Sequence, residues 1–331
     1  MAIKAAINGT GRIGIIVAKI IMQRDDIELV AINTTAESDM LEYLFKYDSI
    51  HKGIDAKAID ETTLMLDGKP VKMFSTRDPK ELDFGSAGAE LVIECTGAFL
   101  TTEKAAPYLK NGVKKVVMSA PAKDDTPTYV LNINTDEYKG ESIISNASCT
   151  TNCLAPICKV LDENFGIDNG LMTTIHSYTN DQNILDVKHK SDKRRARAAA
   201  VNMIPTTTGA AKAIALVMPG LKGKLNGYAM RVPTPDVSVV DLTVNLKKDV
   251  TIEEVNAAFA VAAEGSFKGL IEIDNDKRVS SDFIGSTYSA TFVPDMTSVV
   301  DAKTVKVLAW YDNEWGYSSR LVDMCVFIGI K

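Results

Sequence analysis

Residues 2–14 read AIKAAINGTGRIG, an apolar run followed by glycines in the spacing G-x-G-x-x-G. Ala2–Ile7 predicts a buried strand, and Gly11–Gln23 carries apolar residues along a helical stretch. In such a strand–turn–helix unit the first glycine permits the tight turn, and the second lets the backbone approach a pyrophosphate at the helix N-terminus. The third allows close helix–strand packing. The stretch therefore predicts dinucleotide binding; the alternative is that the glycines serve only a structural turn.

The alternation of strands and helices continues beyond this unit. Further strands are predicted at Glu28–Ile32, Leu91–Glu94 and Lys115–Met118, and helices at Met40–Lys46 and Thr101–Leu109. This order is typical of a doubly wound, mostly parallel Rossmann sheet, so the fold class of the first half is α/β.

After residue 150 the pattern changes. Strand-like runs are Leu171–His176, Leu225–Val232, Val237–Leu246 and Val305–Tyr311, and helical runs are Thr150–Phe165, Ala210–Met218 and Ile252–Ala263. Strands here often follow one another directly, which favours an α+β domain with a mostly antiparallel sheet. Pro156 is expected to bend the first of these helices unless that helix begins later.

A long polar stretch separates two of these runs, from Thr179 to Asn202, and contains KHKSDKRRAR at 188–197. A loop of this length inside a compact domain is usually functional or an interface. A solvated charged face is the other interpretation, and the residues alone leave both open.

Composition limits the class of protein. The chain has 331 residues, 46% hydrophobic and 24% charged, with a formal net charge of −6. This length suits two domains, and the acidic balance argues against nucleic acid or an anionic membrane as partner. No run approaches the roughly 20 apolar residues of a membrane span, and the N-terminus has no secretory pattern. Five cysteines, an odd number, make a disulfide framework unlikely. We expect a cytoplasmic protein.

Residues 145–156 read SNASCTTNCLAP, in which Cys149 follows a predicted strand, Ser142–Ser145, and precedes a helical run. A helix N-terminus lowers the pKa of a thiol, and a nearby imidazolium would lower it further. His176 is one of three histidines and ends the run LMTTIHSYT. The pair is therefore a hypothesis for a cysteine nucleophile with a histidine base.

Other interpretations of this cysteine are weaker. Cys149 and Cys153 have the spacing to share a helix face, but no second pair with metal-ligand spacing accompanies them. An inert core position explains Cys153 and Cys158 well. It explains Cys149 poorly, because the neighbouring Ser148 and Thr150 are better suited to bind an anion than to fill a core.

Five motifs in order carry a resemblance across essentially the whole chain. They are ASCTTNCLAP (147–156), TTIHSYT (173–179), PTTTGAAKA (205–213), RVPTP (231–235) and WYDNEWGYS (310–318). Together they resemble phosphorylating glyceraldehyde-3-phosphate dehydrogenase.

The resemblance implies a mechanism on this chain. Cys149 would attack the aldehyde of D-glyceraldehyde 3-phosphate to form a thiohemiacetal, and His176 would activate the thiol and act as base. Hydride transfer to the nicotinamide of NAD or NADP would leave a thioester. Inorganic phosphate would then release 1,3-bisphosphoglycerate, in a reversible reaction that serves glycolysis or gluconeogenesis.

The resemblance also assigns binding residues and no metal. The substrate phosphate would bind near Thr179, Asp181 and Arg231, and the attacking phosphate near Ser148, Thr150, Arg195, Thr208 and Gly209. Hydroxyl, amide and guanidinium groups are what phosphates require. The cofactor would be held by Asn8, Gly9, Gly11, Arg12, Ile13, Thr96, Gly97, Ser119 and, at the nicotinamide carboxamide, Asn313.

Departures from the family pattern bear on cofactor choice. The second strand ends in Asn33-Thr34 rather than Asn-Asp, and Val187-Lys188 stands where NAD-specific members commonly have Leu-Pro. Loss of an acid and gain of a base both favour a 2′-phosphate. We therefore expect NADP to be accepted, with Thr35, Arg77 and Lys188 as contacts beside Thr34. The alternative is that these substitutions are neutral drift beside a solvent-exposed ribose and do not change cofactor choice.

The resemblance further implies domains at 1–148 and 149–313, with a C-terminal helix at 314–331 packed back on the first. It implies a homotetramer in which the 179–201 segment lies beside a neighbour's cofactor. Erythrose-4-phosphate dehydrogenase is the close alternative, since it shares this fold but hydrolyses its thioester. A Cys-His acyltransferase or hydrolase, and a non-catalytic nucleotide-binding interaction protein, are the alternatives of other classes.

Overall fold

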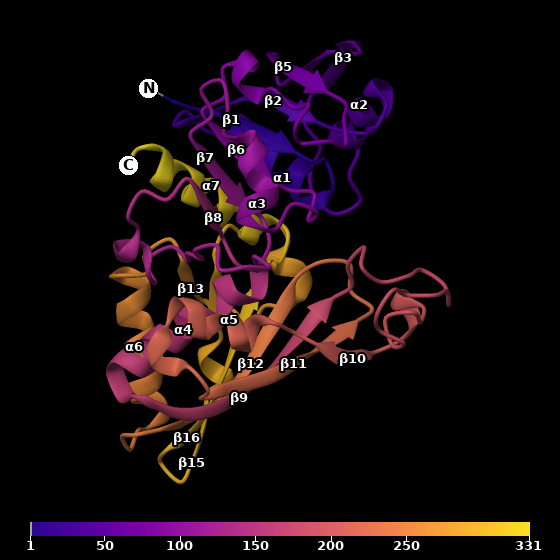
Figure 1. Ribbon diagram of the computed structural model, residues 1–331. Coiled ribbons are helices and arrows are strands. Elements are labelled where there is room, and N and C mark those ends of the chain that lie inside the picture. Colours follow the sequence, from indigo (N-terminus) through magenta and orange to yellow (C-terminus); the bar gives the residue numbers. More distant parts are fainter. Residues whose placement is uncertain (1) are drawn as a thin grey trace. The chain divides into compact units, whose positions relative to one another are not determined.

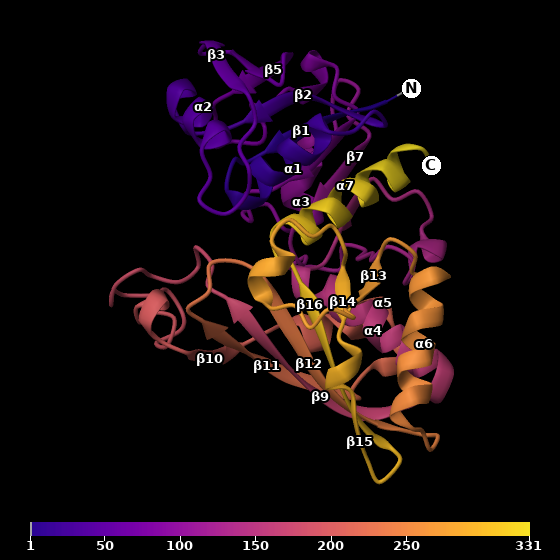
Figure 2. The same ribbon diagram turned by 180° about the vertical axis from the view of Figure 1, so that it is seen from behind.

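The computed structural model describes residues 2–331, and the chain divides into two compact units (Figure 1, Figure 2). The first unit contains the chain up to Leu131 together with Glu137–Ser148 and Ser318–Lys331. The second contains Asn132–Asp136 and Cys149–Tyr317. The unit boundary therefore falls at the first residue of the helix that begins at Cys149.

The first unit is built on an eight-stranded sheet in the order β3-β4-β5-β2-β1-β6-β7-β8. The strands are β1 Ile3–Asn8, β2 Ile27–Asn33, β3 Ala56–Asp60, β4 Thr63–Leu66, β5 Lys69–Phe74, β6 Leu91–Glu94, β7 Lys115–Met118 and β8 Ile143–Ser145. From β5 to β8 all neighbours are parallel, whereas β3 and β4 add an antiparallel edge. A parallel sheet of this kind requires cover on both faces.

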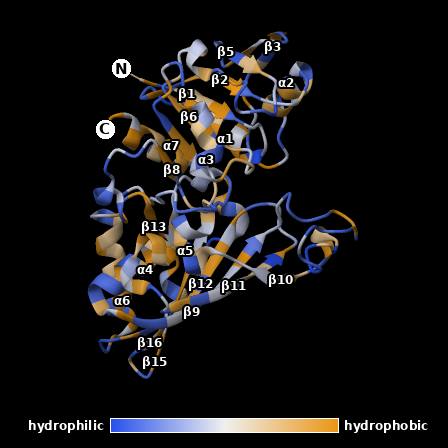
Figure 3. Ribbon diagram, viewed as in Figure 1, coloured by the Kyte–Doolittle hydropathy of each residue, from blue (hydrophilic) through white to orange (hydrophobic). Residues whose placement is uncertain are grey.

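Both faces of the parallel sheet are covered. Helix α1, Arg12–Met22, packs against β1 and β2. Alternate residues such as Ala6, Val92 and Val116 belong to a core cluster on the other side that includes Tyr108. Hydrophobic colour follows β1 and β2 in Figure 3. The remaining helices are α2 Ser38–Lys46, α3 Thr102–Ala105 and α7 Trp315–Gly329, of which α7 enters this unit at Ser318.

The second unit has a mostly antiparallel sheet in the order β10-β11-β9-β12-β16-β14-β13, with β15 beside β16. Its strands are β9 Ile167–Ser177, β10 Ile204–Thr207, β11 Leu225–Val232, β12 Ser238–Leu246, β13 Ile271–Ile273, β14 Ala290–Phe292, β15 Ser298–Val300 and β16 Thr304–Tyr311. Only β9–β11 and β13–β14 pair in parallel among these described strands. Helices α4 Cys149–Phe165, α5 Ala210–Val217 and α6 Ile252–Glu264 complete the unit, and α4 packs on β9, β12, β14 and β16.

The predicted fold class is confirmed, and most predicted elements are present. Strands β6, β7 and β11 have the predicted bounds. The predicted helix at Thr101–Leu109 is instead a single turn, α3, followed by a 3-10 helix at Ala106–Tyr108. The helix predicted at Thr150–Phe165 is present as α4, which begins at Cys149 and contains Pro156 within it, so it does not begin after the proline.

The polar stretch from Thr179 to Asn202 forms an irregular loop whose one regular turn is the 3-10 helix Ala199–Val201. Ion pairs hold it together, for example Arg197 with Asp186 at 2.6 Å. Across residues 2–331, none of the helices has the length and apolar character needed to cross a membrane.

Candidate active site

The two residues predicted to react lie together in the second unit. Cys149 is the first residue of α4, and His176 is the penultimate residue of β9, on which α4 packs. The Sγ atom of Cys149 is 3.6 Å from Nε2 of His176. His176 is buried, and the ring of Tyr311 lies edge-on to it at 5.9 Å. The 3.6 Å between Sγ and Nε2 allows proton exchange between sulfur and imidazole.

Burial shifts the pKa of both members of the pair. Burial, followed by the charge of Arg231, lowers the pKa of His176 to about 3, although its hydrogen bond to Ser177 opposes this. Burial also raises the pKa of the Cys149 thiol, against the opposing effect of Arg231. Burial therefore disfavours the charged form of each group.

Arg231 stands directly beside the histidine because β11 pairs in parallel with β9, with Arg231 opposite His176. Its Nη1 lies 2.6 Å from His176 Nδ1 and 2.9 Å from the Ser177 carbonyl oxygen. Burial lowers the pKa of Arg231. Among residues 2–331, no carboxylate forms an ion pair with this guanidinium within 4.0 Å. A half-buried cation without a counter-ion favours binding of an anion.

A hydroxyl network that the sequence did not reveal continues from Thr150. The Thr150 hydroxyl, 4.0 Å from Cys149 Sγ, is 2.9 Å from the hydroxyl of Tyr311. The same phenol is 2.8 Å from the hydroxyl of Thr174. Tyr311 lies inside the quoted motif WYDNEWGYS, and the alternation of buried residues along β16 is the signal that points it inward.

The Tyr311→Phe variant should be less stable by about 1–3 kcal/mol, because two buried hydroxyls lose their partner. Urea unfolding measures this difference. The Tyr228→Phe variant is the matched control, since Tyr228 is 49% exposed, and its stability should not change. Equal stability of both variants and the parent protein would mean that the network contributes nothing.

Asn313, predicted to hold the nicotinamide carboxamide, is oriented by two serines. Its Oδ1 accepts hydrogen bonds from the hydroxyls of Ser177 at 2.9 Å and Ser238 at 2.6 Å. Both serines are buried, and the Ser238 hydroxyl also accepts from the Ser177 amide at 3.1 Å. With its oxygen used in this way, the side chain has its Nδ2 amide as donor for a carbonyl ligand.

Arg195 lies in a second charged cluster of the same unit. It is paired with the Asp181 carboxylate, and its Nε donates to the Thr206 hydroxyl at 2.9 Å. Asp181 is also 3.5 Å from Nε2 of His189. Burial acts to raise the pKa of Asp181, but the bond to Arg195 outweighs it, so the pKa is lowered. Asp181 therefore holds Arg195 rather than offering a donor to a phosphate.

The other predicted phosphate ligands lie at turns. Gly209 caps the N-terminus of α5, where the Thr208 hydroxyl accepts from the Ala210 amide at 3.3 Å. Thr179 is half-buried at the start of the irregular loop, and its carbonyl accepts from the Gln182 amide at 2.9 Å. Ser148 is half-buried and follows Ala147, whose φ of 56° is unusual for a residue with a side chain.

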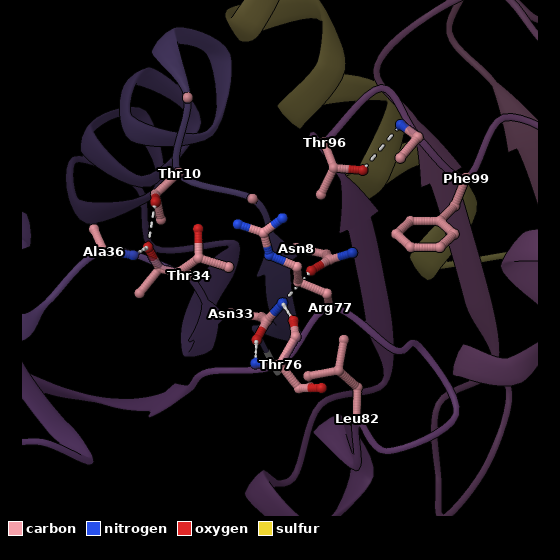
Figure 4. A pocket seen from close by; sticks show the side chains of 14 residues that line it. Asn8, Thr10, Asn33, Thr34, Ala36, Thr76, Arg77, Leu82, Thr96 and Phe99 are labelled. Atoms are coloured by element: carbon pink, nitrogen blue, oxygen red, sulfur yellow. Dashed lines mark hydrogen bonds between the residues drawn. The ribbon is translucent and has the colours of Figure 1, made fainter.

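Most of the predicted cofactor residues of the first unit gather around one pocket, with a volume of about 490 Å³ (Figure 4). It lies at the carboxyl ends of β1, β2 and β6, where doubly wound sheets bind ligands. Predicted residues that line it are Asn8, Gly9, Gly11, Asn33, Thr34, Thr35, Arg77 and Thr96. The pocket-lining residues of the described chain include one arginine and no Asp or Glu.

The glycines of the first turn differ in what surrounds them. Gly9 has φ of 100°, and a Cβ there would lie 2.8 Å from the Thr96 side chain. A Cβ on Gly14 would meet the Gly9 carbonyl oxygen at 1.9 Å. Around Gly11, by contrast, the described chain has no atom within 4 Å of a Cβ position. This open space at the N-terminus of α1 fits the close approach of a pyrophosphate.

The floor of this pocket is a buried polar network. Asn33 donates to Asn8 Oδ1 at 2.7 Å, and Asn8 donates to Glu94 at 2.8 Å. Glu94, which the sequence reading missed, also accepts from the Thr96 amide at 2.7 Å and the Tyr108 hydroxyl at 2.9 Å. Burial raises the pKa of Glu94. The sequence feature that could have indicated Glu94 is a carboxylate at the end of the otherwise apolar strand LVIE.

Several predicted cofactor residues do not line the pocket. They are Arg12, Ile13, Gly97 and Ser119 of the first unit, and Lys188 and Asn313 of the second. Arg12 is paired through its side chain with Asp48 at 3.0 Å. Arg12 and Ile13 open α1, so their backbone amides, rather than the Arg12 side chain, are the groups suited to a pyrophosphate.

Comparison with known proteins agrees with this geometry. Residues 3–102 match the family model described as glyceraldehyde 3-phosphate dehydrogenase, NAD binding domain, and residues 148–313 match its C-terminal domain. The chain is 54% identical over 334 aligned residues to glyceraldehyde-3-phosphate dehydrogenase of Geobacillus stearothermophilus, covering 100% of this chain and 99% of the relative. It is 51% identical to glyceraldehyde-3-phosphate dehydrogenase 1 of Bacillus subtilis (strain 168), with 100% and 99% covered. The Atriplex nummularia enzyme is 50% identical, with 97% and 91% covered.

The doubly wound domain, its pocket and these matches define an oxidoreductase that binds NAD or NADP. More specifically, the chain belongs to the glyceraldehyde-3-phosphate dehydrogenase family. The resemblance found in the sequence is thereby confirmed.

Proposed function

We propose that the chain catalyses the reversible oxidative phosphorylation of D-glyceraldehyde 3-phosphate to 1,3-bisphosphoglycerate, with Cys149 as the nucleophile. The observation that carries this proposal is the pair of half-buried Cys149 and buried His176, at 3.6 Å, beside an arginine without a carboxylate partner. A bound nicotinamide cofactor supplies the hydride acceptor. All other groups that the chemistry needs are side chains and amides of this protein.

The first half-reaction uses Cys149 and His176. Nε2 of His176 takes the proton of the Cys149 thiol as sulfur attacks the aldehyde carbon, which gives a thiohemiacetal. The imidazolium then gives that proton to the carbonyl oxygen, which becomes the thiohemiacetal hydroxyl, and the same nitrogen accepts the hydroxyl proton again as the hydride leaves carbon. A thioester then remains on Cys149. General-base help of this type contributes roughly 10²–10⁴-fold to rate.

The second half-reaction needs an anion beside the thioester. A phosphate oxygen attacks the acyl carbon, the acyl phosphate leaves, and sulfur departs as a thiolate that regains its proton. The groups proposed for this phosphate are Ser148, Thr150, Arg195, Thr208 and Gly209. Thr179 and Arg231 are proposed for the substrate phosphate, with Asp181 orienting Arg195.

Dependence on phosphate separates this function from its close alternative. Oxidation of D-glyceraldehyde 3-phosphate should require inorganic phosphate for continued turnover. Steady-state formation of reduced cofactor, with and without phosphate, measures this. Turnover at an equal rate without phosphate, or a clear preference for erythrose 4-phosphate, would instead indicate a thioester-hydrolysing enzyme of the erythrose-4-phosphate dehydrogenase type.

We also propose that NADP is accepted. The pocket around the end of β2 is free of carboxylates in its described lining and contains Arg77. Thr35 and Arg77 are exposed there, whereas the buried Thr34 hydroxyl is 2.6 Å from that of Thr10 and accepts from the Ala36 amide. Thr35 and Arg77 are therefore better placed to meet a 2′-phosphate than Thr34. Lys188 is the further contact proposed from the loop of the second unit.

The Arg77→Gln variant should lower kcat/KM for NADP by about tenfold, since one charge-assisted contact contributes roughly 1.5–3 kcal/mol. The value for NAD should change little. The Thr34→Asp variant should favour NAD through repulsion of the 2′-phosphate. Steady-state kinetics with each cofactor measure both effects, and a parent enzyme without detectable NADP activity would refute the proposal.

The domain limits proposed from the resemblance are 1–148 and 149–313, with 314–331 returning to the first domain. We further propose a cytoplasmic homotetramer with the 179–201 segment at an interface. Ile184, Leu185 and Val187 support the interface, because they are 83%, 73% and 58% exposed in the single chain. Sedimentation velocity tests the assembly, and a monomer at working concentration would contradict it.

A further inference from the structure

A buried carboxylate at the floor of the cofactor pocket takes no part in the proposed reaction. Glu94 is the last residue of β6 and is 0% exposed. Its Oε1 accepts hydrogen bonds from the Thr96 amide, at 2.7 Å, and from the Thr96 hydroxyl. Its Oε2 accepts from Asn8 Nδ2 at 2.8 Å and from the Tyr108 hydroxyl at 2.9 Å. An ionised carboxylate only accepts hydrogen bonds, so each of these neighbours has to present a donor to it.

The amide of Asn8 carries this requirement to the next strand. Because Nδ2 of Asn8 faces Glu94, its Oδ1 is left for β2, where it accepts from Asn33 Nδ2 at 2.7 Å. Asn33 Nδ2 also donates to the Thr76 carbonyl oxygen at 2.9 Å, and Asn33 Oδ1 accepts from the Thr76 amide at 3.1 Å. The Asn33 side chain therefore pairs with the backbone of Thr76 as a peptide group of a neighbouring strand would. Donors and acceptors alternate without interruption from β6 to the segment that follows β5.

This relay of hydrogen bonds ends in the wall of the pocket. Thr76 and Arg77 both line the pocket, and both lie outside the described helices and strands (Figure 4). The Thr76 hydroxyl is bonded within its own loop, to the Glu81 carboxylate at 2.6 Å and the Asp78 amide at 3.2 Å. The side chain of Asn33 is thus the link that ties the backbone of Thr76 to the sheet.

We propose that Glu94 is a positioning residue for the cofactor. Acting through the two asparagines, it fixes the pocket wall at Thr76 and Arg77 in the form that binds the ADP-ribose half of NAD or NADP. This inference goes beyond the proposed function, since it requires a dinucleotide in the first unit but neither a particular aldehyde nor a 2′-phosphate. It gives a purpose to a carboxylate that is costly to bury.

The Glu94→Gln variant replaces one oxygen by a nitrogen and should break the relay. The two Thr96 donors require the remaining oxygen, so the new Nε2 donor faces Nδ2 of Asn8. Asn8 can turn its amide over, but its Nδ2 then faces Nδ2 of Asn33. Asn33 cannot turn in response without losing both of its bonds to Thr76. The mismatch therefore stays in the network or reaches the pocket wall, whichever amide turns.

A second substitution, Asn8→Asp, should repair this mismatch. In the double variant Glu94→Gln/Asn8→Asp, the carboxylate at position 8 can accept from the new glutamine and from Asn33. The Tyr108 hydroxyl can donate to position 8 and accept from position 94, which reverses its present bonds. The pattern of donors and acceptors is then complete again, with the same net charge. Asn8→Asp alone instead places two carboxylates against each other, and they repel.

Isothermal titration calorimetry of the full-length protein with ADP-ribose measures the effect. We expect Glu94→Gln and Asn8→Asp each to raise Kd by about tenfold or more, as for a buried donor or acceptor that loses its partner. The double variant should return to within about threefold of the parent protein, because the two changes are coupled. Glu90→Gln is the matched control, since Glu90 has a side chain that is 47% exposed and does not line the pocket, and its Kd should not change.

Urea unfolding of the same variants separates positioning from packing. A Glu94→Gln variant that is less stable but keeps the parent Kd would overturn the proposal, and so would a double variant that binds no better than Glu94→Gln. If Glu94→Gln does not fold, the double variant decides, because the repaired network should fold and bind ADP-ribose as the parent does; failure in either respect would overturn the proposal.

This readout is independent of turnover, because ADP-ribose has no nicotinamide. Relay variants that behave as expected in a protein that does not oxidise D-glyceraldehyde 3-phosphate would refute the proposed function and leave the positioning role intact. Normal oxidation together with an unchanged Kd in Glu94→Gln would refute the positioning role alone.

Discussion

The Cys149→Ser variant is expected to lose dehydrogenase turnover by at least about 10⁴-fold, as when a nucleophile is removed from a catalytic unit. A serine hydroxyl is far less acidic than a thiol, and the low pKa of His176 leaves no strong base to ionise it. Binding of the cofactor should be unaffected, since the pocket of the first unit does not include this residue. Steady-state rates and cofactor fluorescence measure the two effects.

The matched control is Cys153→Ala, four residues further along α4. Cys153 is fully buried, and its Sγ is 4.0 Å from the Ala309 carbonyl oxygen, so its role is packing. This variant should retain turnover within a few-fold while losing some stability. If Cys149→Ser kept substantial turnover, or if Cys153→Ala abolished it, the assignment of the nucleophile would be wrong.

The Asp48→Asn variant is expected to destabilise the protein by about 3–5 kcal/mol, because it leaves a buried lysine without its counter-charge. Lys19 and Asp48 have side chains that are 0% and 1% exposed, and Lys19 Nζ is 3.1 Å from the carboxylate. Arg12 is bound to the same oxygen at 3.0 Å. The Ile50 and His51 amides donate to the other oxygen. Urea unfolding measures the loss.

Asp25→Asn is the control, since Asp25 is exposed, and it should be neutral. Lys19→Met should cost less than Asp48→Asn, because Asp48 keeps Arg12 and the two amides. A destabilisation by Asp48→Asn below about 1 kcal/mol would place this ion pair with weak surface pairs and contradict the prediction.

The difference in the free energy of unfolding between the parent protein and Asp48→Asn should also depend on pH. Burial acts to raise the pKa of Asp48, but the two amides and the cations outweigh it and hold the pKa well below its usual range. Its contribution is therefore complete above the unfolded pKa of about 4 and is lost as pH falls toward the folded value. The difference in unfolding free energy between the parent protein and Asp48→Asn should be constant from pH 7 to pH 5 and become smaller at lower pH.

The elements that could be predicted well from the sequence are those whose own residues specify them, with little dependence on neighbouring elements. Strands β6 and β7 are short and mostly apolar, LVIE and KVVM, which is the pattern expected of a parallel strand that is covered on both faces. The short, half-exposed strands β3, β4 and β5 have mixed burial and were missed, although β4 pairs with β5 in regular register and with β3 with one register shift. Edge strands of this kind are specified by their partners as much as by their own residues.

The candidate site shows the same division. Cys149 and His176 are found from residue type and neighbours, and the structure places them within reach of each other. The groups that orient them are set by tertiary packing. Tyr311 meets Thr150 only because β16 lies beside α4, and Ser238 reaches Asn313 from a strand that begins after Val237.

The conformation of Val237 is also beyond sequence reasoning. Its φ of 65° is a costly state for a β-branched residue, so propensity would argue against it. Strain of this kind, of roughly 1–3 kcal/mol, persists where the surrounding structure fixes it and is concentrated at functional sites. Here it precedes the serine that orients Asn313.

The most direct test of the account is a rapid-mixing experiment with D-glyceraldehyde 3-phosphate and cofactor in the absence of phosphate, followed by peptide mass spectrometry. We predict a burst of one reduced cofactor per chain, an acyl group on the peptide that contains Cys149, and continued turnover once phosphate is added. No burst, an acyl group on another residue, or steady turnover before phosphate is added would contradict a Cys149 thioester that phosphate resolves.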